Sequence, residues 1–272
     1  TVLCVGHAAR TDQPALTSLL RRPTHAKGID NLQYACRSNS SMITIIVYHP
    51  NYHIGFDSPL TSVIDTLAKN YSSWIKSCST NATLAQDVAD AYTATLRQTP
   101  GSAGQIATLI MGADAAWGES TGPVMPNALP QRSKIDEQTI QKLAPLLEKG
   151  GSNMLLLEHH GTDPAALALA SKIASKTGCR LMTGTFPGRV DGGPGAAAVE
   201  RLPYFPEQVL ATLKGVENLI LVGGQIPASF FAYKGVPGQL IPEGCKVSRL
   251  SHIEEDAIDA LQRMAERLSA QN

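Results

Sequence analysis

Apolar runs of strand length alternate with segments of helical period along most of the chain. In the first half, the pattern predicts strands at 15–20, 42–47, 74–77 and 105–111 and helices at 28–37, 60–68 and 81–96. This alternation is typical of parallel sheets with crossover helices.

The alternation is clearer in the second half. There it predicts strands at 153–157, 180–184, 218–223 and 245–250 and helices at 136–149, 163–177, 207–214 and 254–269. Between the halves, prolines at 123, 126 and 130 interrupt any periodicity, because proline resists continued helix or strand. We therefore predict an α/β protein with two doubly wound parallel-sheet domains, the first incomplete (1–116) and the second Rossmann-like (136–272), joined by a linker at 117–135.

Composition excludes some partners. The 272 residues hold 23 Lys plus Arg and 23 Asp plus Glu, so no net field favours nucleic acid or an anionic membrane. No apolar run reaches the roughly 18 residues of a membrane span, and no basic-then-apolar leader opens the chain. The first residue is Thr1 rather than Met, so we expect a processed or excised start.

The five cysteines are scattered without CxxC spacing, which favours neither a zinc site nor a disulfide framework. We expect buried free thiols in a reducing compartment, hence a cytoplasmic protein without a metal site. These residues are Cys4, Cys36, Cys78, Cys179 and Cys245.

Two glycine-bearing loops are candidates for ligand binding in the second half. Gly223-Gly224-Gln225 follows a predicted strand, where backbone approaches a ligand closely, although the full GxGxxG of a dinucleotide site is absent. The other loop, 184–195, carries Arg189 and Asp191, whose setting suits a phosphate. Both loops are also consistent with purely structural turns.

Histidines provide the other candidates. His49 and His53 follow a predicted strand and are acid–base or substrate-contact candidates, or ordinary polar loop residues. His159 and His160 are adjacent, so on an extended segment they point apart, and a solvated loop is the preferred interpretation. Asp57 and Asp114 are isolated acids, and no GxSxG, P-loop or HExxH motif occurs.

The run Val199-Glu200-Arg201-Leu202-Pro203-Tyr204-Phe205-Pro206-Glu207, with the loop 184–195, resembles the central domain of thiamine-diphosphate enzymes of the acetolactate-synthase-like group. Residues 53–62, Trp74, 105–110 and 114–117 resemble the second half of that family's pyrimidine-binding domain. Residues 1–14 and 28–38 are similar to the two helices after the family's catalytic glutamate. The resemblance implies a carboligase or decarboxylase of 2-oxo acids, a transferase or lyase that uses thiamine diphosphate and magnesium.

The chain also departs from the family. The resemblance puts the catalytic glutamate before Thr1 and the magnesium-binding domain after Asn272, so we expect neither within this sequence. Arg22-Pro23-Thr24 stands where the family has a Gly-Pro-Gly turn near the cofactor. Val47-Tyr48-His49 stands where it has Gly-Asp-His, so only the histidine is kept.

Three hypotheses follow. The chain is a truncated or degenerate homologue, inactive alone, with a retained binding or assembly role. Alternatively, it is one subunit or fragment of an active enzyme completed by another chain, or a free-standing nucleotide-binding protein. We expect a homo-oligomer or a complementary chain, and thiamine diphosphate and magnesium only where a partner completes the site. Any FAD or adenine nucleotide is expected at Gly184–Arg189 and 223–227, where Arg189 is the cation.

Overall fold

The computed structural model describes residues 1–11, 13–102, 104–129, 131–150, 152–190, 198–232 and 234–270, with the backbone alone at 21–23. It divides into two compact units, Thr1–Gln131 and Arg132–Asn272. The division falls inside the proline-bearing segment 117–135, whose described residues form no helix and no strand beyond one bridge between Ser133 and Glu255.

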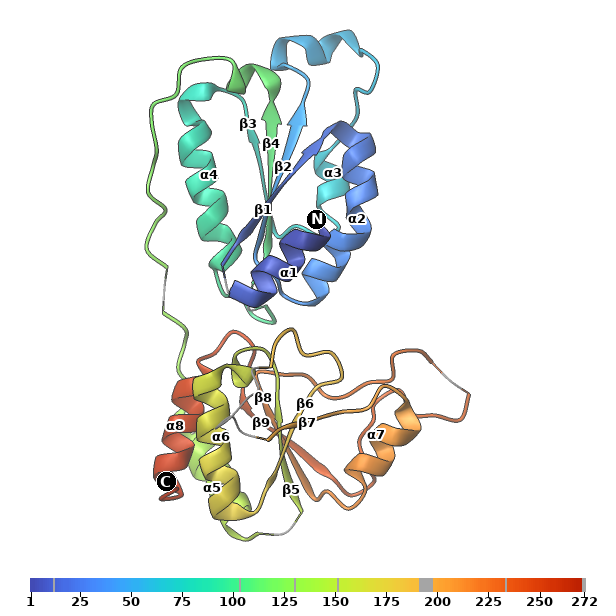
Figure 1. The fold of residues 1–272 in the computed structure, drawn as a ribbon, viewed down its shortest axis with the longest axis vertical. Coiled ribbons are helices and arrows are strands. Elements are labelled where there is room, and N and C mark those ends of the chain that lie inside the picture. The colour runs from blue at the N-terminus through green and yellow to red at the C-terminus, as the bar shows by residue number, and fades with distance from the viewer. Residues whose placement is uncertain are drawn as a thin grey trace. The chain divides into compact units, whose positions relative to one another are not determined.

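Unit 1 contains a four-stranded parallel sheet with the order β1-β2-β4-β3. Helices α1, α2 and α3 cover one face of this sheet and α4 covers the other (Figure 1). The strands are β1 (Ala15–Leu20), β2 (Met42–Tyr48), β3 (Trp74–Cys78) and β4 (Ile106–Gly112). The helices are α1 (Val2–Thr11), α2 (Arg21–Arg37), α3 (Asp65–Ala68) and α4 (Asn81–Leu96), with 3₁₀ turns η1 (Asn51–Phe56) and η2 (Ala113–Ala116).

Strand position explains the residue pattern in unit 1. The central strands β2 and β4 are apolar at nearly every position, because both of their faces are covered. Edge strand β1 instead alternates buried and exposed side chains. Ala15 and Leu19 pack into the core beneath α1 and α2, whereas Leu16 and Leu20 point to the face that carries α4.

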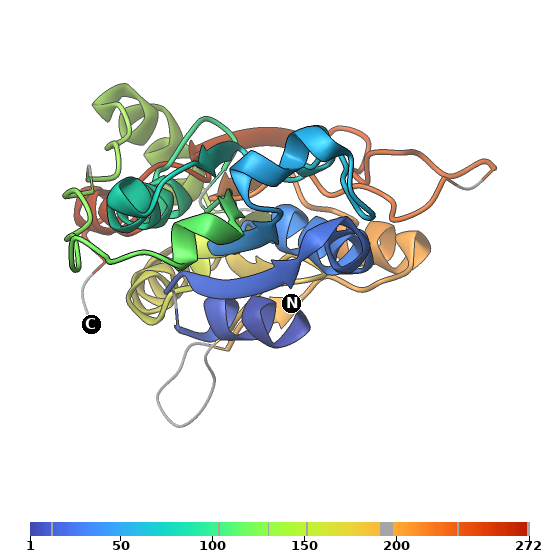
Figure 2. The ribbon, with the colours of Figure 1, turned by 90° about the horizontal axis from the view of Figure 1, so that it is seen from above.

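Unit 2 contains a five-stranded parallel sheet with the order β7-β6-β5-β8-β9. Helices α5, α6 and α8 cover one face and α7 the other, so β8 sends Ile220 and Val222 to the first and Leu219 and Leu221 to the second (Figure 1). The strands are β5 (Asn153–Leu157), β6 (Arg180–Thr183), β7 (Glu200–Arg201), β8 (Asn218–Val222) and β9 (Lys246–Ser251). The helices are α5 (Glu137–Glu148), α6 (Pro164–Thr177), α7 (Pro206–Leu213) and α8 (Ala257–Arg267), with the 3₁₀ turn η3 (His159–Thr162). The long connection between β8 and β9 extends away from the sheet (Figure 2).

Local chemistry sets several helix ends in unit 2. The Asp136 carboxylate accepts the Gln138 N–H at 3.1 Å and caps α5, as the sequence predicts. Asp256 caps α8 in the same way by accepting the Asp259 N–H at 2.9 Å. Helix α6 ends at Gly178, whose φ of 73° is a left-handed conformation that glycine adopts without steric cost.

The prediction of an α/β protein with two parallel sheets is confirmed, whereas several element boundaries are wrong. The helix predicted at 60–68 is confined to Asp65–Ala68, and Leu60 has a φ of 74° that no right-handed helix allows. Helix α2 begins at Arg21, directly after β1, and not at Gly28. Helix α8 begins at Ala257, after its cap, and β7 was not predicted.

The prediction of buried thiols is correct only in part. Cys78 and Cys179 are buried, Cys4 and Cys245 are half-buried, and Cys36 is exposed. Burial raises the pKa of the Cys78 and Cys179 thiols. No helix in the part of the chain that the structure describes is long and apolar enough to cross a membrane.

Candidate functional site

Glu158 lies at the carboxyl end of β5, between the two glycine loops that the sequence singles out in unit 2. Its carboxylate accepts the backbone N–H of Gln225 at 3.1 Å. A methyl group on Gly184 or on Gly224 would overlap with the two carboxylate oxygens. The turns after β6 and β8 therefore close around this one side chain.

The backbone of Glu158 is also held firmly. Its N–H donates to Val222 O at 3.0 Å, and its carbonyl accepts the Gly161 N–H at 2.8 Å. Gly223 has a φ of 69°, and a Cβ there would lie 2.7 Å from the Glu158 carbonyl oxygen. Burial raises the pKa of the Glu158 carboxyl, and the hydrogen bond from Gln225 offsets part of that rise.

The structure brings Gly184, Gly223, Gly224 and Gln225 together around Glu158. Arg189 lies half-buried in the loop after β6, whereas Asp191 and the rest of that loop to Gly195 lie outside the described residues. The sequence pattern assigns no role to Glu158. An acidic residue that directly follows the apolar run 154–157 at the end of a strand is the signal that would have pointed to it.

His159 and His160 do not form the solvated loop that the sequence suggested. They begin the 3₁₀ turn η3, and burial together with the neighbouring His160 lowers the pKa of His159 to about 4. The Arg132 guanidinium donates to Nε2 of His160, so Nδ1 of that ring donates to Asp163 at 3.1 Å. The two rings are thus engaged separately and form no chelate.

The structure brings His49 and His53 together at the carboxyl end of β2, with ring centroids 5.7 Å apart. His49 is buried and its Nε2 lies 3.4 Å from the Ser58 hydroxyl. His53 is half-buried and also contacts the exposed ring of Phe56 at 5.6 Å. A histidine pair beside an exposed ring suits substrate contact, and this role stays a prediction.

The two aspartates differ in setting. Asp114 accepts the Asn51 backbone N–H at 3.0 Å and its side-chain amide at 3.2 Å, so it ties η1 to η2. Asp57 is exposed at the end of η1 with a φ of 48°. The described part of the chain holds no group of three His, Cys, Asp or Glu side chains that would bind a metal ion.

An exposed aromatic cluster occupies the carboxyl side of the sheet in unit 2. Its rings come from the loops after β6, β7 and β8, contact one another at 4.6–6.0 Å between centroids, and are each 41–66% exposed. They are Phe186, Tyr204, Phe205, Phe230 and Phe231. So many exposed rings in contact are typical of a binding surface.

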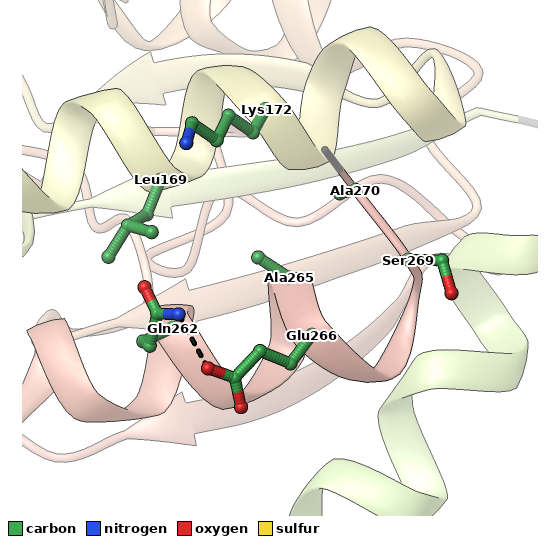
Figure 3. A pocket seen from close by; sticks show the side chains of 7 residues that line it. All are labelled: Leu169, Lys172, Gln262, Ala265, Glu266, Ser269 and Ala270. Carbon is green, nitrogen blue, oxygen red and sulfur yellow. Dashed lines mark hydrogen bonds between the residues drawn. The ribbon is translucent and has the colours of Figure 1, made fainter. Parts of the chain in front are cut away.

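A surface pocket of about 580 Å³ lies between α6 and α8 (Figure 3). Its wall holds no candidate residue, and a Gln262–Glu266 hydrogen bond of 2.6 Å spans one side. The lining residues are Leu169, Lys172, Gln262, Ala265, Glu266, Ser269 and Ala270. The pocket carries no chemistry that relates it to the candidate site.

Comparison with known proteins identifies the fold and the family. No protein-family model matches the chain. The chain is 36% identical over 264 residues to a Mycobacterium tuberculosis protein named "Putative acetolactate synthase large subunit IlvX", a match that covers 97% of this chain and 50% of that protein. 

Two solved structures share the fold. The first is a "putative thiamin diphosphate-dependent enzyme" from Mycobacterium smegmatis, with a TM-score of 0.78, 19% identity and coverage of 97% of this chain and 53% of that one. The second is the thiamine diphosphate-dependent 4-hydroxybenzoylformate decarboxylase of Rhodococcus jostii RHA1, with a TM-score of 0.77, 17% identity and the same coverage, 97% and 53%. The chain therefore belongs to the thiamine-diphosphate-dependent enzyme family, in its acetolactate-synthase-large-subunit-like group, and spans about half the length of the relatives it matches.

Proposed function

We propose that this chain is a homologue of a 2-oxo-acid carboligase or decarboxylase whose retained role is binding and assembly. By itself it does not turn over a 2-oxo acid. The observation that carries the proposal is an uncovered apolar part of the sheet in unit 1, made by Leu16 and Leu20 on strand β1, which we name the β1 strip. These two side chains are 51% and 59% exposed.

The β1 strip is exposed because no described helix covers it. Helix α4 packs over β4, β3 and β2, and it leaves Leu16 and Leu20 of β1 exposed on this face. In the parallel register, Leu16 lies beside Ile43 and Leu20 beside Val47, so the strip continues the apolar surface of β2. The outer edge of β1 has no strand partner among the described residues. An unpaired edge beside exposed leucines is a surface that proteins normally cover.

We assign this surface to a second copy of the chain. All six residues of β1 are uncharged, and the whole chain has a formal net charge of zero at pH 7. Two copies therefore approach without electrostatic repulsion. The aromatic cluster of unit 2 supports a binding role independently.

The residues present do not fit thiamine diphosphate. Where the family has a glycine turn near the cofactor, β1 passes directly into α2, with Leu20 as an N-cap residue that makes no side-chain cap. Helical backbone at Arg22-Pro23-Thr24 offers no glycine turn for close approach.

The second candidate is one chain of an active enzyme that a complementary chain completes. The His49–His53 pair favours it, because two histidine rings at a carboxyl edge are positioned as substrate contacts would be. A complementary chain would then supply the groups that hold thiamine diphosphate and magnesium. Turnover by a mixture of this chain and such a partner, and by neither alone, would favour this candidate.

Light scattering at micromolar concentration tests the assembly role. We expect a dimer or larger species for the wild-type chain and a shift toward monomer for Leu16→Ser/Leu20→Ser. Leu3→Ser is the matched control, because Leu3 is 87% exposed on α1, outside the strip. A monodisperse wild-type monomer, or a double variant that associates as the wild type does, contradicts the proposal.

A further inference from the structure

The place predicted for an anionic ligand in unit 2 already holds a carboxylate. Strand β5 has β6 on one side and β8 on the other, so the sheet order reverses there. Open α/β sheets hold ligands at such a point, outside the carboxyl ends of the strands. Glu158 is the first residue after β5 and lies at this point.

The Glu158 carboxylate fills the space that glycines leave open. Gly184 and Gly224 have no side chain, and any Cβ there would overlap with Oε1 and Oε2, respectively. Oε2 also accepts the Gln225 N–H at 3.1 Å, a donor that a bound phosphate would otherwise use. The same carboxylate therefore contacts both glycine loops.

The backbone shows how closely this part of unit 2 is packed. His159 has a φ of 48°, a left-handed conformation that is sterically unfavourable for a residue other than glycine. A Cβ on Gly161 would lie 2.9 Å from the Val222 carbonyl oxygen. The turns after β5 and β8 thus leave little room for movement.

We propose that Glu158 is a built-in anion: its carboxylate takes the place and the hydrogen-bond donor of a phosphate group and closes this crevice to phosphate-bearing nucleotides. Glu158 is then a specificity-determining residue: its carboxylate fills the space that a phosphate would need, and its negative charge repels a phosphate. A phosphate a few ångströms from a carboxylate in a half-buried setting is repelled strongly. The proposal is independent of the assembly role.

Binding of inorganic pyrophosphate and ADP, measured by isothermal titration calorimetry at pH 7.5, tests this proposal. We expect the wild-type chain to bind pyrophosphate and ADP with Kd values in the millimolar range or weaker. Glu158→Ala should bind pyrophosphate with a Kd at least tenfold lower than that of the wild type. Glu207→Ala is the control, because it removes an exposed carboxylate from α7 of the same unit. Equal affinities of wild type and Glu158→Ala, or submillimolar binding by the wild type, would overturn the proposal.

A double-mutant cycle tests occupancy without any ligand. Gly184→Ala should destabilise the wild-type chain, because the new methyl group meets the carboxylate, and should cost much less in the Glu158→Ala background. Thermal unfolding of the four proteins, with circular dichroism to confirm folding, gives the coupling. If Gly184→Ala costs the same in both backgrounds, Glu158 does not occupy this space and the proposal fails.

Discussion

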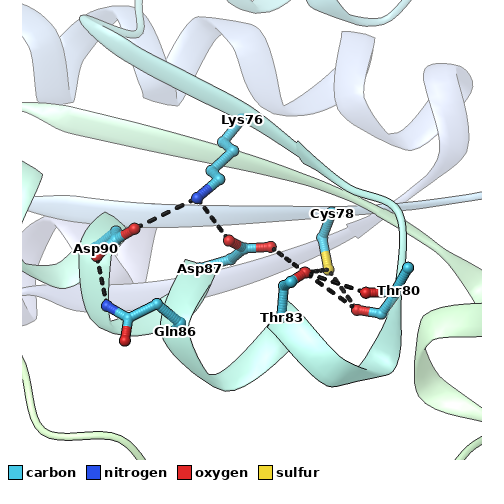
Figure 4. A network of polar contacts seen from close by, with 7 residues as sticks. All are labelled: Lys76, Cys78, Thr80, Thr83, Gln86, Asp87 and Asp90. Atoms are coloured by element: carbon cyan, nitrogen blue, oxygen red, sulfur yellow. Dashed lines mark hydrogen bonds and ion pairs between the residues drawn. The ribbon is translucent and has the colours of Figure 1, made fainter.

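The ammonium group of Lys76 lies 2.6 Å from a carboxylate oxygen of Asp87, which joins edge strand β3 to helix α4 (Figure 4). The Asp87 side chain is only 3% exposed and also accepts the Thr83 hydroxyl at 3.1 Å. Burial raises the pKa of this carboxyl, but the hydrogen bonds from Lys76, Cys78 and Thr83 together outweigh burial and lower it. Asp87 is therefore a charged residue whose burial depends on its partners.

Asp87→Ala should destabilise unit 1 by about 1–3 kcal/mol, because it leaves Lys76 with Asp90 alone and removes one of the acceptors of the Thr83 hydroxyl. Urea unfolding followed by tryptophan fluorescence measures this loss. Both tryptophans, Trp74 and Trp117, belong to unit 1. The control Asp90→Ala, whose side chain is 30% exposed, should cost less than about 1 kcal/mol. Equal losses in the free energy of unfolding for the two variants would show that the buried Lys76–Asp87 pair stabilises unit 1 no more than the exposed one.

His25 should make unit 1 sensitive to mild acid. This ring is fully buried against Tyr71, its Nδ1 has no hydrogen-bond partner, and burial lowers its pKa from 6.5 to about 4. Between pH 6.5 and 4, His25 is protonated in the unfolded chain but stays neutral in the folded chain. The free energy of unfolding of unit 1 is therefore unaffected by this histidine above pH 6.5. It falls by about 2–4 kcal/mol as the pH is lowered toward 4.

The tryptophan-detected urea midpoint at pH 7 and at pH 4.5 checks this expectation. His25→Gln should flatten the pH dependence, whereas His7→Gln, an exposed substitution on α1, should leave it as in the wild type. The expectation is wrong if both variants lose stability on acidification as steeply as the wild type.

Cys36 should react with a thiol reagent before the other cysteines. It is exposed on α2, whereas Cys78 and Cys179 are buried and burial raises their pKa, which lowers their thiolate fraction. Titration of the folded protein at pH 8 should show a fast phase of about one thiol. Cys36→Ser should abolish this phase; its persistence would place the reactive thiol elsewhere.

Residue pattern was sufficient to predict most of the fold. Helix α4 and strand β5 have the bounds that were predicted, because their apolar periods are regular and clear turn residues flank them. The two-residue strand β7 is too short to carry a period, and the left-handed backbone of Leu60 has no local signature in the sequence. Such features depend on tertiary context.

The candidate site was predictable only in outline. The glycines mark where backbone must approach something closely, but the pattern does not reveal that the approaching group is the Glu158 side chain. Glu158 directly follows β5 and lies 26 residues before Gly184 and 66 before Gly224, so only the sheet order brings the three residues together. Likewise, the environment of His159 follows from the burial of η3.

Steady-state turnover by the purified chain tests the proposed function most directly. The chain is incubated with pyruvate or benzoylformate, thiamine diphosphate and magnesium, and carbon dioxide release is followed against a protein-free blank. We expect no release above the blank. Sustained decarboxylation by pure chain, proportional to its concentration, would contradict it.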